Sequence, residues 1–330
     1  RWHGGPETLC VTLASGASGW HDLRPVNPLI RIIPAVLVRF FAKPYVAGDS
    51  LDRAMEVVGK LRKERGLLST LDLLAEDIKL PEQVERNLNA YVQMVEAAAA
   101  MPVADRPTVS LKPSSYTTSP LHEGGDAEGS REAMMQIAKR AEELGVDVSI
   151  DMEGRYWTDF TIETLREMHA AGLRNVGGVV QTRLHRTEQD LEELPEGMRI
   201  RLVIGIYKEP SEIAQTEKPD MKDRMLVLAE RLLERGHYVE FATHDVVYVR
   251  RFLEEVVPRV GVGRDRYEVQ MLYGVPRDRF LADLNRQGVK ARLYVPFALS
   301  WDLAIEYLRR RLDEYPAMMW LVTKNMIWRS

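Results

Sequence analysis

The chain has 330 residues, of which 45% are hydrophobic and 28% charged, a composition typical of a globular protein with one α/β barrel or two ordinary domains. Its formal net charge of -4 gives no electrostatic reason to expect nucleic acid as a partner. The single cysteine, Cys10, excludes an internal disulfide and a thiolate metal cluster, and it fits a reducing cytoplasm.

The N-terminal region contains the longest apolar stretch, PLIRIIPAVLVRFF at residues 28–41. It is shorter than the roughly 18 residues of a membrane-spanning helix, and Arg31, Pro34 and Arg39 interrupt it. We therefore expect residues 1–49 to form a helical arm packed on the body, with contact to a membrane surface as the alternative. Because the chain starts with Arg1, a preceding targeting segment stays open.

From about residue 50, short β-branched or leucine-rich runs alternate with longer amphipathic runs. The runs that predict strands are residues 70–74, 108–111, 146–151, 176–180, 200–205, 238–242, 267–272 and 291–295. The runs that predict helices are residues 82–100, 131–144, 160–170, 188–194, 221–234, 246–256, 277–285 and 301–313. Gly145, Gly172, Gly236 and Gly288 follow four of these runs, as glycine does at left-handed helix ends.

Eight strands, each followed by a helix, predict an α/β fold: a closed (β/α)8 TIM-type barrel formed by residues 50–330. A doubly wound open sheet is the alternative, but it requires a glycine-rich phosphate turn after an early strand. The nearest candidate, residues 261–263, lacks the third glycine and leads into a strand. We interpret it as a loop.

Polar residues gather where the predicted strands end, which is the active-site face of such a barrel. They are Asp72, Lys112, Asp151, Gln181, Arg201, Tyr207, His244, Asp245, Gln270 and Tyr294. The cations Lys112 and Arg201 make this rim cation-rich, which suits an anionic ligand or a flavin that becomes anionic on reduction. Neither a Ser/His/Asp arrangement nor a metal-ligand spacing such as HExxH occurs.

Several motifs resemble, in order, those of proline dehydrogenases. They are RLVIGIYKEP at 201–210 (family pattern RLVKGAYxEP), FATHD at 241–245, EVQMLYG at 268–274, YVP at 294–296 and RRLDE at 310–314, with agreement also at 45–51, 70–74, 109–112, 150–153 and 179–181. The resemblance covers roughly residues 40–330. It implies a distorted (βα)8 barrel that binds FAD noncovalently.

The resemblance implies that Arg310 and Arg311 bind the carboxylate of proline. Two guanidinium groups suit this task because they bind carboxylates bidentately and keep their charge. Tyr307 lies on the same helical face, and Glu314 is spaced to hold the guanidiniums in place. On spacing alone, this segment also fits a solvated basic helix end.

Further roles follow from the same resemblance. Lys112 is expected to face the substrate carboxylate with Asp151 as its electrostatic partner, and Tyr207, Leu272 and Tyr294 to line the pocket around the pyrrolidine ring. Arg201 corresponds to an arginine beside the flavin N5. The remaining candidate flavin contacts are Gln181, Thr243, His244 and Gln270.

The implied reaction is hydride transfer from C5 of L-proline to FAD N5, giving Δ1-pyrroline-5-carboxylate, the first step of proline catabolism. A membrane quinone would reoxidise the flavin, which implies a cytoplasmic protein that associates transiently with the membrane surface. No metal is implied.

Two positions in the fifth-strand motif depart from the family pattern: Ile204 replaces the usual lysine, and Ile206 the usual alanine. Strand alternation would place both on one face with Gly205 opposite, so the pocket would lose a cation and gain bulk. Tyr307 is retained, which favours proline over 4-hydroxyproline. Another cyclic or N-substituted secondary amino acid as substrate, and a non-redox barrel that holds an anion, are the alternatives.

Overall fold

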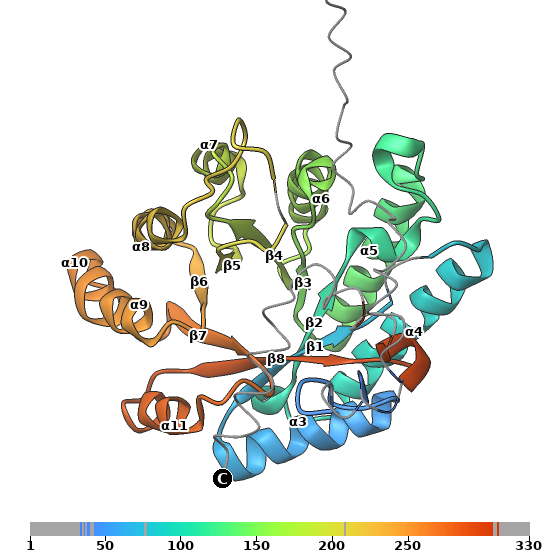
Figure 1. Ribbon diagram of the computed structural model, residues 1–330, viewed down its shortest axis with the longest axis horizontal. Helices are drawn as coiled ribbons and strands as arrows, with labels where there is room; N and C mark the ends of the chain where they lie inside the picture. The colour runs from blue at the N-terminus through green and yellow to red at the C-terminus, as the bar shows by residue number, and fades with distance from the viewer. Residues whose placement is uncertain are drawn as a thin grey trace, which may run out of the picture.

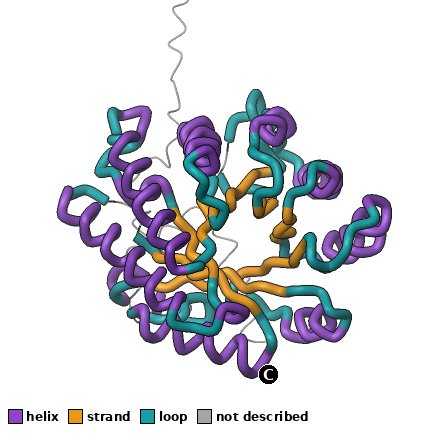
Figure 2. Tube along the Cα trace, turned by 180° about the vertical axis from the view of Figure 1, so that it is seen from behind, coloured by secondary structure: helices purple, strands orange, loops and turns teal. Residues whose placement is uncertain are grey.

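A computed structural model describes residues 43–75, 78–207 and 209–305, together with residues 34, 36, 38, 39 and 309. Within them, eight parallel strands form a closed barrel in the order β1-β2-β3-β4-β5-β6-β7-β8. Figure 1 shows the strands at the centre with the helices around them, and Figure 2 shows the same arrangement from behind. The predicted (β/α)8 barrel is confirmed, and the doubly wound sheet is excluded.

The strands lie close to their predicted positions. Their bounds are β1 Leu68–Leu73, β2 Thr108–Leu111, β3 Val148–Ile150, β4 Val176–Gln181, β5 Arg199–Val203, β6 Tyr238–Ala242, β7 Tyr267–Leu272 and β8 Ala291–Phe297. Strands β2, β6 and β7 match the prediction at both ends. The difference that bears on function is at β5, which ends at Val203 rather than at residue 205.

The helices follow the strands around the outside of the barrel. Their bounds are α3 Leu51–Arg65, α4 Pro81–Ala99, α5 Ala127–Leu144, α6 Thr158–Ala170, α7 Thr187–Glu193, α8 Lys218–Glu234, α9 Val246–Arg251, α10 Val257–Val260 and α11 Asp278–Arg286. Gly145 ends α5 with φ 65° and donates to the carbonyls of Ala141 and Glu142, which is the predicted left-handed cap. Of the predicted helix 301–313, residues 301–305 are helical and residue 309 is too, and the others lie outside the described residues.

Two helical features differ from the prediction. Helix α3 is not among the predicted helices, because only Ala54, Val58 and Leu61 are buried along it and so narrow an apolar stripe gives a weak signal. The predicted helix 246–256 extends to Val260 and contains a π-helical segment, Phe252–Val256. Pro258 follows that segment, and a residue without an N–H cannot complete the regular hydrogen-bond ladder.

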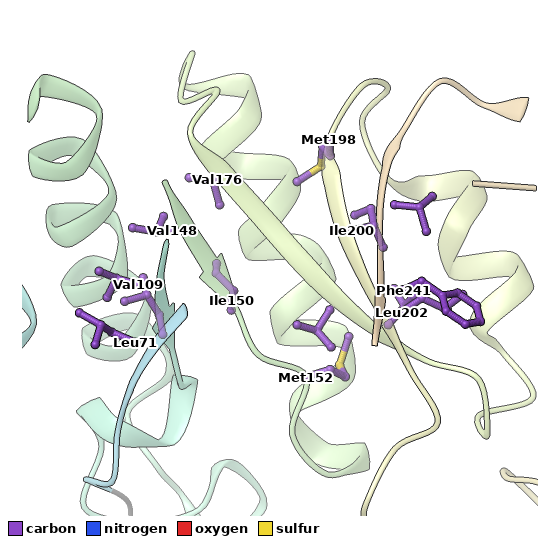
Figure 3. Close-up of a cluster of buried hydrophobic side chains, with 14 of the residues drawn as sticks. Leu71, Val109, Val148, Ile150, Met152, Val176, Met198, Ile200, Leu202 and Phe241 are labelled. Atoms are coloured by element: carbon purple, nitrogen blue, oxygen red, sulfur yellow. The ribbon is translucent and has the colours of Figure 1, made fainter. Parts of the chain in front are cut away.

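Apolar side chains point outward from the strands and pack beneath the helices. Figure 3 shows part of this layer, with Leu71, Val109, Val148, Ile200 and Phe241 on five strands. All five are fully buried. Burial of this layer is the main source of stability for the barrel.

Polar side chains from the same strands point into the barrel. Arg201 of β5 donates to Ser110 of β2 and to Asp151 after β3, at 3.5 and 2.8 Å. Arg292 of β8 donates to Thr108 of β2 at 3.1 Å. These bonds join strands that are not neighbours, so they cross the interior, where most barrels place branched apolar residues.

The segment before α3 lies against the end of β8. Ala47 donates to the carbonyl of Pro296 at 2.8 Å, and Ala298 donates to that of Gly48 at 3.1 Å. Val38 and Val46 are buried in a small apolar cluster that also includes Leu74. Most of the predicted arm lies outside the described residues. No helix in the described ranges has the length and apolar character needed to cross a membrane.

Candidate active site

Lys112 follows β2 at the carboxyl-terminal end of the barrel. It is 8% exposed, and its Nζ forms a salt bridge with Asp72 of β1. Its expected partner was Asp151, but Asp151 accepts hydrogen bonds from Arg201 and Tyr294 instead. The reason is strand order: β1 is the direct neighbour of β2, with Asp72 in register with Ser110.

Asp151, Arg201 and Tyr294 meet inside the barrel. Arg201 Nη1 donates to Asp151 Oδ1 at 2.8 Å, and Tyr294 Oη donates to Asp151 Oδ2 at 2.6 Å. The Arg201 guanidinium lies over the Tyr294 ring, 5.0 Å from its centroid. Burial, and then the negative charges of Asp151 and Asp72, raise the pKa of Tyr294 well above its ordinary value, so the phenol keeps its proton and acts as a donor.

Gln181 ends β4 and turns its amide into the site. Its Nε2 donates to the carbonyls of Met152 and Glu153 at 3.2 and 3.0 Å, which fixes the orientation of the side chain. Its Oε1 is buried and has no hydrogen-bond partner among the described residues. Gln181 therefore offers an acceptor of fixed direction to a ligand.

His244 and Thr243 follow β6. The N–H of Leu272 donates to His244 Nε2 at 3.4 Å, so the ring accepts there and its buried Nδ1, which has no partner within the described ranges, carries the proton. Burial, and then the charge of Arg277, lower the pKa of His244 to about 4. Thr243 Oγ1 accepts from the N–H of Asp245 at 3.2 Å and can still donate.

Asp245, the other polar residue after β6, has a structural task. Its side chain accepts from the N–H of Val247 at 3.1 Å and so caps α9. Lys222 pairs with its other oxygen at 2.5 Å. Both oxygens are thus engaged away from the barrel interior.

Gln270 and Leu272 lie on β7 at different depths. Gln270 is 2% exposed, and its Nε2 donates to Glu240 and Glu268, both at 2.7 Å, so the donor side of its amide serves the barrel interior. Leu272 ends the strand in register with Tyr294, which suits the expected wall position.

The end of β5 overturns one expectation. Gly205 has φ 100°, a left-handed conformation that turns the chain out of the strand, so alternation does not continue through residues 204–206. Ile204 packs against the barrel core, whereas Ile206 is 48% exposed. The two isoleucines therefore have different surroundings and do not line one common face.

The loops after β3 and β5 are joined above the strand ends by an Arg155–Glu209 contact. The Arg155 N–H donates to Glu209 Oε1 at 2.9 Å, and Arg155 Nη1 donates to Oε2 at 3.4 Å. Arg155 Nη2 also donates to the hydroxyl of Tyr156, whose ring stacks on His122 in the β2 loop at 4.0 Å. Tyr207, an expected pocket residue, lies in the β5 loop within this linked rim.

The expected carboxylate-binding residues Tyr307, Arg310, Arg311 and Glu314 lie outside the described residues. Their roles stay predictions.

Charged residues on three strands were not singled out from the sequence. These are Glu240 of β6, Glu268 of β7 and Arg292 of β8, each at least 93% buried. Arg292 Nε and Nη2 donate to Glu268 at 2.5 and 3.1 Å. The available signal was their place in strand runs of alternating character, where every second residue is charged or polar.

These residues change the charge expected at the site. The inward-facing cations Lys112, Arg199, Arg201 and Arg292 are matched by the carboxylates Asp72, Asp151, Glu240 and Glu268. The expected cation-rich rim is therefore compensated within the described residues. An anionic ligand gains from the direction of particular donors here rather than from an excess of positive charge.

Three residues expected to contact a flavin keep buried polar atoms without a hydrogen-bond partner in the described parts of the chain. These atoms are the Gln181 Oε1 acceptor and the donors Arg201 Nε, Arg201 Nη2 and His244 Nδ1. A buried polar atom that lacks a partner is costly unless a ligand or water satisfies it. The mixture of one acceptor and three donors fits the edge of a heteroaromatic ring system such as a flavin.

Comparisons with known proteins point to one family. A family model described as proline dehydrogenase matches residues 54–320. The chain is 33% identical to a proline dehydrogenase of Deinococcus radiodurans over 87% of this chain and 90% of the relative. It is 29% identical to proline dehydrogenase 2 of Bacillus subtilis, over 87% of this chain and 91% of the relative.

Solved structures support the fold. A proline utilization A protein of Bdellovibrio bacteriovorus, inactivated by N-propargylglycine, superposes with a TM-score of 0.73 at 22% identity. The match covers 83% of this chain and 32% of that one, so this chain spans about a third of the longer protein.

Proposed function

Because the chain belongs to the proline dehydrogenase family, we propose that it oxidises L-proline to Δ1-pyrroline-5-carboxylate with noncovalently bound FAD. The observation that carries this proposal is the set of buried polar atoms on Gln181, Arg201 and His244 that have no hydrogen-bond partner within the described residues. When bound, FAD would accept a hydride from C5 of proline at its N5. The side chains would bind and orient the proline and the flavin.

On the flavin side, Gln181 would accept a hydrogen bond and His244 would donate one, with Thr243 beside it. Arg201 would place a positive charge next to the ring, where it favours the more negative reduced state. Gln270 would support these flavin-binding residues from inside the barrel, since its Nε2 already donates to Glu240 and Glu268.

On the substrate side, Tyr207, Leu272 and Tyr294 would surround the ring of proline. Lys112 is already paired with Asp72, so its charge is partly compensated. The substrate carboxylate would therefore depend chiefly on Arg310 and Arg311, with Tyr307 and Glu314 positioning them. Asp151 would act by holding Arg201 and Tyr294 in place.

The remaining parts of the proposal rest on the family resemblance. Electrons would pass to a membrane quinone, from a cytoplasmic protein that contacts the membrane surface transiently. Residues 1–49 would form an arm on the catalytic barrel of residues 50–330.

The test is anaerobic titration of the purified, FAD-loaded protein with L-proline while the flavin absorbance is followed. We expect the oxidised band to bleach with proline. A protein that takes up no FAD, or whose flavin stays oxidised with proline and with every other cyclic secondary amino acid offered, would contradict the proposal.

A second candidate is oxidation of another cyclic or N-substituted secondary amino acid. The observation in its favour is Ile206, a large apolar side chain left 48% exposed beside Tyr207 at the rim. A panel containing proline, 4-hydroxyproline, pipecolate and N-methylproline separates the two candidates. Fastest reduction by proline would dismiss the second.

A further inference from the structure

Glu240 occupies an unusual place inside the barrel. It lies in the middle of β6, is 2% exposed, and is in register with Arg201 of β5 and with Glu268 of β7. Two buried carboxylates side by side are unfavourable unless cations and hydrogen bonds compensate them. The way in which the negative charge of Glu240 is compensated therefore determines its electrostatic effect on the neighbouring residues.

The two carboxylates are compensated differently. Glu268 has its own cation, because Arg292 donates to both of its oxygens at 2.5 and 3.1 Å. Glu240 Oε2 accepts from Gln270 Nε2 at 2.7 Å, and its nearest cationic nitrogens are Arg201 Nε at 3.5 Å and Arg199 Nη1 at 3.6 Å.

Both of those arginines bind another carboxylate more closely. Arg199 Nη1 is 3.0 Å from Asp147, and Arg201 Nη1 is 2.8 Å from Asp151. Glu240 thus has no cation of its own among the described residues. Its negative charge acts mainly on arginines that already have a partner.

The Arg201 guanidinium consequently has a carboxylate on two sides. Asp151 accepts from Nη1 at 2.8 Å, and Glu240 lies 3.5 Å from Nε without forming a hydrogen bond. Nε and Nη2 are both buried without a hydrogen-bond partner in the described parts of the chain. Although burial opposes it, the charges of Asp151 and then Glu240 raise the pKa of Arg201, so the guanidinium stays charged. Nη2, which faces neither carboxylate, is the nitrogen that can meet a ligand.

We propose that the negative charge of Glu240 lowers the reduction potential of the flavin by opposing the positive potential that Arg201 presents to the ring. This inference rests on the proposed function and concerns the tuning of the same site. A carboxylate behind the guanidinium weakens the positive potential that Arg201 presents to the ring. Its removal should favour the reduced cofactor.

The test variant is Glu240→Gln in the FAD-loaded protein. Glutamine keeps the size of the side chain and an oxygen that can accept from Gln270, removes the charge, and replaces the oxygen on the Arg199 side by an NH2 group. We expect the reduced flavin to be favoured about tenfold, which raises a two-electron potential by about 30 mV. The KM for proline should stay within about twofold, because the contacts of Glu240 within the described residues are with Gln270, Arg201 and Arg199 and not with the expected wall residues Tyr207, Leu272 and Tyr294.

Two controls separate this role from a structural one. Asp147→Asn removes a carboxylate from the Arg199 side, at the start of β3 and away from the strand ends, and should leave the potential unchanged. Arg201→Gln, which removes the opposing positive charge, should shift the potential in the opposite direction, downward. Flavin content and the thermal midpoint are measured for each variant.

The outcomes are distinct. A Glu240→Gln protein that binds FAD with the wild-type potential would overturn the inference, and so would a potential below the wild-type value. If Glu240→Gln does not fold, Glu240→Asp, which retracts the charge, should raise the potential by a smaller amount, and an unchanged potential there overturns the inference. Wild-type protein without FAD would instead refute the proposed function, and the inference with it.

Discussion

The imidazole of His244 is kept neutral by its surroundings. Burial, and then Arg277, lower its pKa to about 4, whereas an unfolded histidine has a pKa of about 6.5. Between these values the unfolded chain binds the proton and the folded protein does not, so stability falls as pH decreases from about 6.5 toward 4. His237, which is fully buried with its pKa also lowered, first by burial and then by Arg235, adds to this dependence.

We expect His244→Gln to flatten the dependence of the unfolding free energy on pH between 7 and 4.5, as measured by urea unfolding. The same variant should bind FAD about tenfold more weakly, about 1.4 kcal/mol, because the Nδ1–H donor is lost. His237→Gln is the matched control: it should flatten the pH dependence and leave FAD affinity unchanged. Parallel pH profiles for His244→Gln and wild type would contradict this account.

At the scale of elements, Gly205 shapes the end of β5. Its φ is 100°, and a Cβ there would lie 2.3 Å from Gln181 Oε1. Any side chain would therefore strain the backbone and also push aside the acceptor assigned to the flavin.

Gly205→Ala should destabilise the protein by about 2 kcal/mol and lower its FAD affinity. Gly172→Ala is the matched control, since Gly172 has φ 90° and a Cβ there would meet nothing within 4 Å. It should show the backbone strain without the loss of FAD, in urea unfolding and in flavin titration. Equal FAD affinity in the two variants would mean that FAD binding does not depend on the position of the Gln181 side chain.

The Arg155–Glu209 contact joins two loops over the strand ends. Glu209 is nearly buried, with its side chain 4% exposed, so the pair is less screened than a surface ion pair. Arg155→Gln should raise the KM for proline about threefold and speed limited proteolysis of the β5 loop. Arg166→Gln, which breaks an exposed pair with Glu193 at 3.6 Å, should change neither, and a similar effect of both would argue against a role of the rim contact.

The sequence predicted the positions of the strands better than the contacts among the polar side chains inside the barrel. Periodicity located all eight strands, because each carries a buried outward face such as Val109 or Phe241. It did not indicate that Glu240, Glu268 and Arg292 meet, since partners on different strands depend on barrel closure and register. The positive φ of Gly205 was equally hidden, so alternation was continued past the true end of β5.

For the whole molecule, the buried Arg292–Glu268 pair links the inside of the barrel. Arg292→Met should destabilise the protein by about 3–5 kcal/mol in urea unfolding, because Glu268 would remain buried without its cation. The double variant Arg292→Met with Glu268→Gln should recover much of that loss. Arg286→Met, which removes an exposed pair with Asp283, should lower the unfolding free energy by less than about 1 kcal/mol. Equal losses in Arg286→Met and Arg292→Met would show that the buried pair contributes no more to stability than an exposed one.

The seam between β1 and β8 has a consequence for how the chain is made. Arg292 donates to the carbonyl of Ser69, 223 residues away, and the two strands pair from Leu68 with Arg292 to Leu73 with Phe297. A ribosome synthesises β1 long before β8, so neither the closing strand pair nor the contacts of Arg292 can form until nearly the whole barrel has been made. We therefore expect the barrel to close late in synthesis or after it.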